Sequence, residues 1–263
     1  MDSLLPQFSW KNVLAVLVLS LGIGEAGQAQ RLPASQTGTS GSNMWLTFLS
    51  DARLSTRWGL HTDVQTRRGK EAGSSPQQLL RLGVNYRVAP VLQFTAGYAY
   101  ASSYMYGDYA TASPLPEHRI YQQLLLRDDS GRVHTQHRYR LEQRWVRQPG
   151  QEITYLNRMR YQLRLAVPLV SHGRMGPRTP YLVGADEIFI GFGASSSRNF
   201  FDQNRAYLAL GYQFTKTTAL EVGYQHQMAQ TAGIVGYQYN HTLQLALSFH
   251  PDLRRGLPLA SAL

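Results

Sequence analysis

The chain of 263 residues has no cysteine, few lysines and few charged side chains. Without cysteine it can form no disulfide framework, cysteine nucleophile or thiolate metal site. Lys11, Lys70 and Lys216 are its only lysines, so the formal charge of +10 comes almost entirely from arginine. These arginines are spread along the chain instead of forming a basic patch, which argues against nucleic-acid binding. With 16 Tyr and 9 Phe against 16% charged residues, the composition favours sheets over exposed helices.

The apolar run near the N-terminus is short for a transmembrane helix, which needs about 20 residues. It extends from Val13 to Ile23, follows Lys11, and precedes the small residues at 27–29. A basic residue, a short apolar core and a small-residue cleavage site are typical of a secretory signal peptide. We therefore predict a signal peptide over residues 1–29, in preference to a signal anchor.

After a polar segment at residues 30–43, apolar and polar side chains alternate along most of the chain. In the segment 205–228, for example, Leu208, Leu210 and Val222 alternate with Gly211, Glu221 and Gln225. A period of two residues predicts β-strands, and no segment has a convincing helical period. We expect strands near 44–54, 57–67, 78–88, 91–103, 117–127, 133–147, 153–167, 180–191, 202–214, 217–229 and 238–249.

Four features favour a membrane barrel over a soluble sheet. Many of these segments are about 10–13 residues long, as a tilted membrane-spanning strand requires. Their polar face is charged, and connections alternate between short turns and longer loops, apart from the long connection at 168–179. Aromatic residues near strand ends resemble the girdles of transmembrane barrels. They are Trp45, Trp58, Tyr86, Tyr98, Tyr100, Trp145, Tyr155, Tyr181, Tyr212 and Tyr224.

We predict an all-β protein with a single antiparallel up-and-down transmembrane β-barrel over residues 44–250, followed by a C-terminal tail at 251–263. Bacterial single-chain barrels have an even number of strands, whereas the alternation gives eleven segments. Either a strand near 30–43 is hidden, that tract threads the lumen, or one segment is misassigned. We expect 12 strands, with 10 as the alternative.

The arginines on the polar face are the main functional feature. If neighbouring strands pair antiparallel, they form a cationic strip inside the barrel, with acids such as Glu117 and Asp186 as further partners. Such side chains either fill and rigidify a narrow lumen or line a passage for anions or small solutes. The predicted lumen-lining residues are Arg81, Arg87, Arg138, Arg140, Glu142, Arg144, Arg158, Arg160, Arg164, Glu187 and Glu221.

Two other functional classes stay open. An outer-membrane lipid hydrolase would need a serine, a histidine and an orienting group that converge, and Ser248 with His241 is the pair to consider. A soluble periplasmic lipid-binding barrel is the other alternative. No catalytic motif is present, and no metal-ligand spacing of histidines occurs, so we expect no cofactor and no metal, and enzymatic activity is not favoured.

Several segments in order resemble one family. These are "LLRLGVNYRVAPVLQFTAGYAY", "HRYRLEQRW", "NRMRYQLRLAVPL", "PYLVGADEIFI" and "RAYLALGYQFTKTTALEVGYQHQ". Over residues 43–249 the chain is similar to the bacterial outer-membrane β-barrel family catalogued as domain of unknown function 2490. The resemblance implies a barrel in the outer membrane of a Gram-negative cell envelope, with outer-membrane lipids and the barrel-assembly machinery as partners. It implies no established activity and therefore no catalytic residues.

Overall fold

Every strand predicted from the alternation is present in the structure, a computed structural model. It describes residues 40–69, 77–103, 115–129, 131–147, 152–170, 174–193, 200–230 and 237–254. The predicted signal peptide lies outside these residues. The strands are β1 (Ser40–Arg53), β2 (Trp58–Gly69), β3 (Gln77–Ala89), β4 (Leu92–Ser103), β5 (Leu115–Asp128), β6 (His134–Val146), β7 (Thr154–Pro168), β8 (Thr179–Phe192), β9 (Phe201–Gln213), β10 (Thr218–Gln230) and β11 (Tyr237–Phe249).

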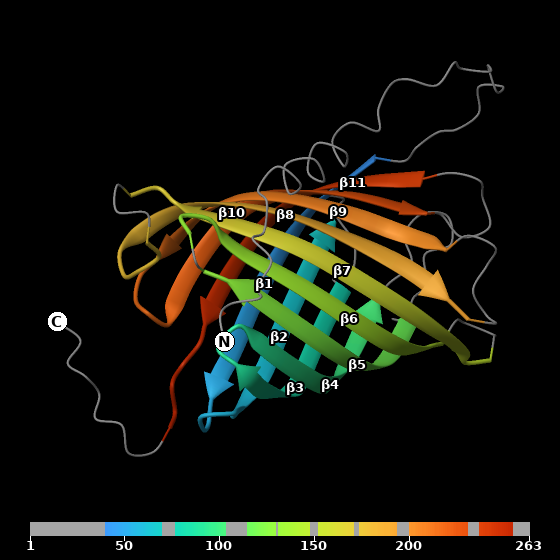
Figure 1. Cartoon of the computed structure of the whole chain (residues 1–263). Coiled ribbons are helices and arrows are strands. Elements are labelled where there is room, and N and C mark those ends of the chain that lie inside the picture. Colours follow the sequence, from blue (N-terminus) through green and yellow to red (C-terminus); the bar gives the residue numbers. More distant parts are fainter. Residues whose placement is uncertain are drawn as a thin grey trace, which may run out of the picture. The chain divides into compact units, whose positions relative to one another are not determined.

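The strands close into one barrel in which sequence neighbours are spatial neighbours (Figure 1). All consecutive strands pair antiparallel, whereas β1 and β11 close the barrel as a parallel pair from Ser40–Tyr239 to Leu49–Ser248. The barrel class is confirmed, but the expected count of 12, or alternatively 10, is wrong, because the described residues form eleven strands. With an odd number of strands, the first and last strands run in the same direction. They therefore close the barrel as a parallel pair, and no twelfth strand is needed.

The hidden strand considered near residues 30–43 does not appear in the described part of that tract. Residues 40–43 belong to β1, which starts earlier than the predicted boundary at 44. Residues 30–39 lie outside the described part of the chain. Among the described residues no helix is long and apolar enough to cross a membrane.

Connections differ in length between the two ends of the barrel. The short-turn end carries the connections 54–57, 90–91, 129–133 and 214–217, and the long-loop end carries 70–76, 104–114, 147–153, 193–200 and 231–236. The exception is 169–178, which is long at the short-turn end. Here Met175 packs against a buried apolar cluster that includes Tyr181, Val183 and Ala209. Met175 therefore covers part of this interior cluster at the short-turn end.

The chain beyond β11 continues along the end of β1. Arg53 N donates to the Pro251 carbonyl at 2.9 Å, and Leu253 N donates to the Arg53 carbonyl at 2.8 Å. Asp51 N donates to Nδ1 of His250 at 3.0 Å, and burial lowers the pKa of His250, which favours its neutral, accepting form. The first residues of the predicted tail thus extend the parallel closing pair.

The two faces of the barrel wall have opposite character. Leu208, Leu210 and Val222 point outward and are 58%, 63% and 48% exposed. Ala209 and Glu221 have the opposite parity and are buried inside. The period of two therefore separates an apolar exterior from a polar interior, the reverse of a soluble barrel with an apolar core.

Candidate functional site

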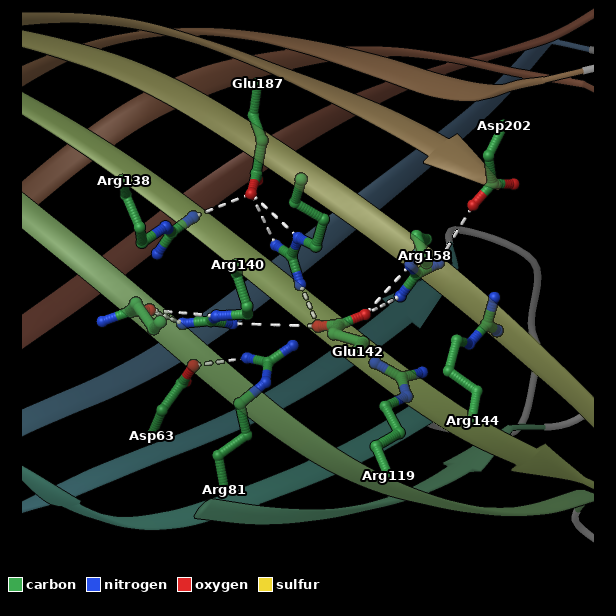
Figure 2. A network of polar contacts seen from close by, with 12 residues as sticks. Asp63, Arg81, Arg119, Arg138, Arg140, Glu142, Arg144, Arg158, Glu187 and Asp202 are labelled. Carbon is green, nitrogen blue, oxygen red and sulfur yellow. Dashed lines mark hydrogen bonds and ion pairs between the residues drawn. The ribbon is translucent and has the colours of Figure 1, made fainter. Parts of the chain in front are cut away.

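The barrel interior is crossed by a network of arginines and carboxylates (Figure 2). Its centre is Glu142 on β6, which is 1% exposed. Arg158 binds Glu142 Oε2 through Nη2 at 2.6 Å and Nε at 2.9 Å, and Arg160 binds Oε1 through Nη1 at 2.7 Å. Both arginines come from β7, whose register sets Arg158 opposite Glu142 and Arg160 opposite Arg140. The antiparallel β6–β7 pair therefore assembles the centre of the network.

Glu187 on β8 is the second hub. Arg160 Nε and Arg138 Nη2 each donate to Glu187 Oε1 at 2.9 Å. Arg160 thus bridges Glu142 and Glu187 and joins three strands. Arg140 Nε and Nη2 donate to Gln123 on β5 at 3.0 and 2.6 Å, and its Nη1 lies 4.0 Å from Glu142.

Three smaller groups complete the network. Glu117 on β5 binds Arg119 Nε at 2.7 Å and Arg144 Nε at 2.5 Å. Arg81 pairs with Asp63 from the neighbouring strand. On β10, Glu221 pairs with Arg164 and accepts a hydrogen bond from Tyr181 Oη at 3.0 Å. Of the predicted lumen-lining residues only Arg87 stands apart, half-buried at the short-turn end of β3 with no ion pair among the described residues.

Sequence reasoning missed several interior groups and misplaced others. Asp63, Arg67, Arg119 and Arg205 lie inside the barrel or at its mouth, and their parity within the strands was the available signal. Asp186, expected as a partner of the arginine strip, points outward and accepts a hydrogen bond from Asn204 Nδ2 at 3.0 Å.

The expected aromatic girdles include two residues that are not on the exterior. Trp45 and Tyr181 are 5% and 3% exposed and lie inside the barrel. Tyr181 packs flat on the wall at Gly211, where an added Cβ would lie 2.2 Å from the ring. Position near a strand end does not show whether an aromatic residue faces outward or into the lumen. Only its odd or even place in the alternation of the strand distinguishes the two.

Eight arginines share six carboxylates in the network, so the interior carries excess positive charge. The arginines are Arg81, Arg119, Arg138, Arg140, Arg144, Arg158, Arg160 and Arg164, and the acids are Asp63, Glu117, Glu142, Glu187, Asp202 and Glu221. At the centre, Arg140 and Glu142 are only 2% and 1% exposed. Side chains therefore fill the middle of the lumen, and the central groups meet each other instead of water.

The pair considered for lipid hydrolysis does not come together. His241 shares its parity on β11 with outward Leu243, whereas Ser248 shares its parity with buried Thr242 and Ala246. Seven residues of extended strand separate them by roughly 23 Å. Among the described residues, no group of three His, Cys, Asp or Glu side chains could hold a metal ion.

The outward face also carries polar side chains, and five pairs of them bond across neighbouring strands. Their shortest contacts measure 2.5 to 3.2 Å. The pairs are Tyr98–His118, Gln122–Gln143, His137–Tyr161, Asp186–Asn204 and Tyr224–His241.

Comparison with known proteins identifies a family but supplies no activity. An uncharacterized protein of Methylorubrum extorquens is 30% identical over 190 residues, which cover 70% of this chain and 77% of that protein. No solved structure matches the chain significantly. The family model described as protein of unknown function (DUF2490) matches residues 42–243. The chain therefore belongs to the DUF2490 family.

Proposed function

We propose that this protein is an integral outer-membrane β-barrel whose lumen is closed by its own side chains, and that its role is structural and not that of an open pore. The observation that carries the proposal is the inverted distribution of polarity. Large apolar side chains such as Leu210 and Leu82 cover the outside, and the ion pairs of Glu142 and Glu187 fill the inside. A soluble lipid-binding barrel needs an apolar interior, which this charged network does not provide.

The paired polar side chains on the exterior support a hydrocarbon environment. In water, exposed histidine, tyrosine and glutamine side chains have solvent as a partner, whereas in lipid each must find a protein partner. The cross-strand pairs Tyr224–His241 and Gln122–Gln143 fit the second situation. Strand lengths of 12 to 15 residues are also sufficient for tilted membrane-spanning strands.

Aromatic contacts near both ends of the barrel fit interfacial girdles. At the short-turn end, the rings of Trp58 and Tyr86 lie 4.8 Å apart, and at the long-loop end those of Trp145 and Tyr155 lie 5.3 Å apart. Such rings favour the headgroup level. Outer-membrane lipids and, during insertion, the barrel-assembly machinery are the partners that this proposal implies.

Cysteine labelling tests the lipid-facing surface directly, because the chain has no cysteine of its own. A fluorophore attached to Leu210→Cys in lipid vesicles should be quenched strongly by spin labels placed on lipid acyl chains. Attached to Thr217→Cys, in the turn before β10, it should be quenched weakly by the same lipids. Equal, weak quenching at both positions, or recovery of the protein in the soluble periplasmic fraction, would contradict the membrane location.

Conductance in planar bilayers tests the closed lumen. The purified barrel should give no steady single-channel current, because buried arginines and carboxylates occupy the middle of the lumen. A steady current that falls when Arg140 or Arg160 is replaced by alanine would instead establish an anion or small-solute passage. Membrane insertion should be verified in the same sample by heat-modifiable migration on gels, so that a silent bilayer is not mistaken for a closed barrel.

A further inference from the structure

Two interior arginines have no carboxylate of their own. Arg67 on β2 donates to the amide oxygens of Gln77 at 2.9 Å and Gln65 at 3.1 Å, both neutral groups. Arg205 on β9 lies opposite Glu187 in the β8–β9 register, but Glu187 already binds Arg138 and Arg160. Among the described residues neither Arg67 nor Arg205 makes an ion pair within 4.0 Å, so their positive charges are left without close compensation.

Both guanidinium groups lie near the ring of Trp45, and Arg205 also lies 4.6 Å from the ring centroid of Phe189. The central carbon of Arg67 lies 3.5 Å from the ring centroid of Trp45, and that of Arg205 lies 5.1 Å from it. The two cations are therefore within about 9 Å of each other, a distance at which like charges repel in a weakly hydrated interior. The quadrupole of the indole ring attracts each cation but does not cancel the repulsion between the two. A bound anion would cancel it.

Unpartnered hydrogen-bonding groups lie on the adjoining strands. Thr242 is opposite Asn43, two residues before Trp45, and Gln225 is opposite Tyr207, two residues after Arg205. Nε of Arg67, Nε of Arg205 and Nε2 of Gln225 are buried atoms without a partner, and so is the hydroxyl of Thr242. Gln225 and Thr242 are directly opposite each other in the β10–β11 register and are 6% and 1% exposed. Buried donors in native proteins are normally bonded, so these groups can donate to an acceptor that enters the site.

Both arginines lie in the half of their strands nearer the long-loop end. Arg67 is two residues from the last residue of β2, and Arg205 is four residues after the first residue of β9, both at that end. Their side chains are half-buried, whereas Arg140 and Glu142 are almost completely buried. Arg205 also borders the central network, because it lies opposite Glu187 and shares the ring of Phe189 with Arg158 and Arg160.

We propose that Arg67, Arg205 and Trp45, together with Gln225 and Thr242, form a binding site for a small oxyanion of the phosphate or carboxylate kind. Guanidinium groups bind such anions through charge-assisted, often bidentate hydrogen bonds. The buried amide of Gln225 and hydroxyl of Thr242 supply neutral donors beside them. Lipid headgroups are excluded as the occupant because the site lies inside the barrel wall. The proposal concerns the lumen alone and does not depend on the membrane location.

Tryptophan fluorescence provides a local reporter for the test. Trp58 is exposed on the exterior and Trp145 is also on the outward face, so Trp58→Phe with Trp145→Phe leaves Trp45 as the tryptophan of the described barrel. Sodium phosphate and sodium acetate are titrated into this protein in detergent, against sodium chloride at equal ionic strength. We expect a saturable change in Trp45 emission with at least one oxyanion and none with chloride, and calorimetry should give the same Kd.

The same Arg→Gln change, made at the proposed site and at a neighbouring residue outside it, tests which arginines bind the anion. Arg67→Gln or Arg205→Gln should raise the Kd by about tenfold or more, because each removes charge-assisted hydrogen bonds to the anion. Arg68→Gln, which makes the same change one residue later on the outward face, should leave the Kd unchanged. Arg67→Lys serves as a second variant that keeps the charge but loses the planar fork, and it should also weaken binding.

Two results would overturn the proposal. One is the absence of a saturable response to phosphate and acetate in both fluorescence and calorimetry. The other is a response that Arg67→Gln, Arg67→Lys and Arg205→Gln leave unchanged. Neither result bears on the membrane location, which the quenching experiment at Leu210 tests separately.

Discussion

Replacing Glu142 by glutamine should lower the free energy of unfolding of the barrel by about 3–5 kcal/mol. The carboxylate is 1% exposed and binds both Arg158 and Arg160. The neutral amide keeps the size of the side chain but removes its charge. Arg158 and Arg160 then keep only Asp202 and Glu187 as partners, and the buried guanidinium groups, including Arg140, repel each other more strongly. Chemical unfolding in detergent or lipid, followed by the gel shift of the heat-modifiable barrel, measures the loss.

The control is Glu152→Gln, the same chemical change at an exposed position in the connection between β6 and β7. Exposed substitutions away from special contacts change stability by roughly 0.5 kcal/mol or less. If both variants unfold at the same denaturant concentration, water must solvate the arginine–carboxylate network. The closed lumen, which is inferred from the burial of this network, would then be wrong.

The second large effect is expected from Gly97→Ala, which should destabilise the barrel by about 3 kcal/mol. Gly97 lies on β4, and a Cβ at this position would be 2.2 Å from the carbonyl oxygen of Leu82 and 2.7 Å from the hydroxyl of Tyr121. The first contact is to backbone, which cannot move without separating β3 from β4. Chemical unfolding of the variant in the same detergent measures the change.

Gly184→Ala is the matched control for this prediction. Gly184 is in the middle of β8, and a Cβ there would meet no atom within 4 Å. The methyl group should leave stability unchanged or raise it by up to about 1 kcal/mol, because alanine restricts the unfolded chain more than glycine does. If both variants were destabilised equally, the loss would come from replacing glycine in a strand and not from the close contact at Gly97, and the prediction would be wrong.

The sequence alone predicts which residues face outward better than it predicts which side chains pair inside the lumen. Leu208, Leu210 and Val222 can be assigned to one face from the period of two alone, because a strand turns successive side chains to opposite sides. The same parity places Arg158 and Arg160 together, and the β6–β7 register brings Glu142 to them. Parity cannot tell which of several acids is close enough to pair, and Asp186 was assigned to the wrong face although Glu187, its neighbour, was not.

The number of strands illustrates a second limit. The eleven segments are readable from alternation, but the even-number rule led to a count of twelve. Closure depends on whether the first and last strands can pair. Parallel pairing of β1 with β11 provides hydrogen bonds for the free edge of each strand, although a parallel pair is slightly less stable per residue than an antiparallel one. That choice depends on contacts between residues about 200 positions apart.

By itself the sequence determined the all-β class, the strands and the separation of an apolar from a charged face, because these follow from local period and composition. Only the tertiary structure decided the strand count, the ion pairs of Glu142 and Glu187 inside the barrel, and the approach of Arg67 and Arg205 to Trp45. These depend on which side chains meet across the barrel interior, and the distance between strands that are far apart in the chain is not encoded in any local pattern.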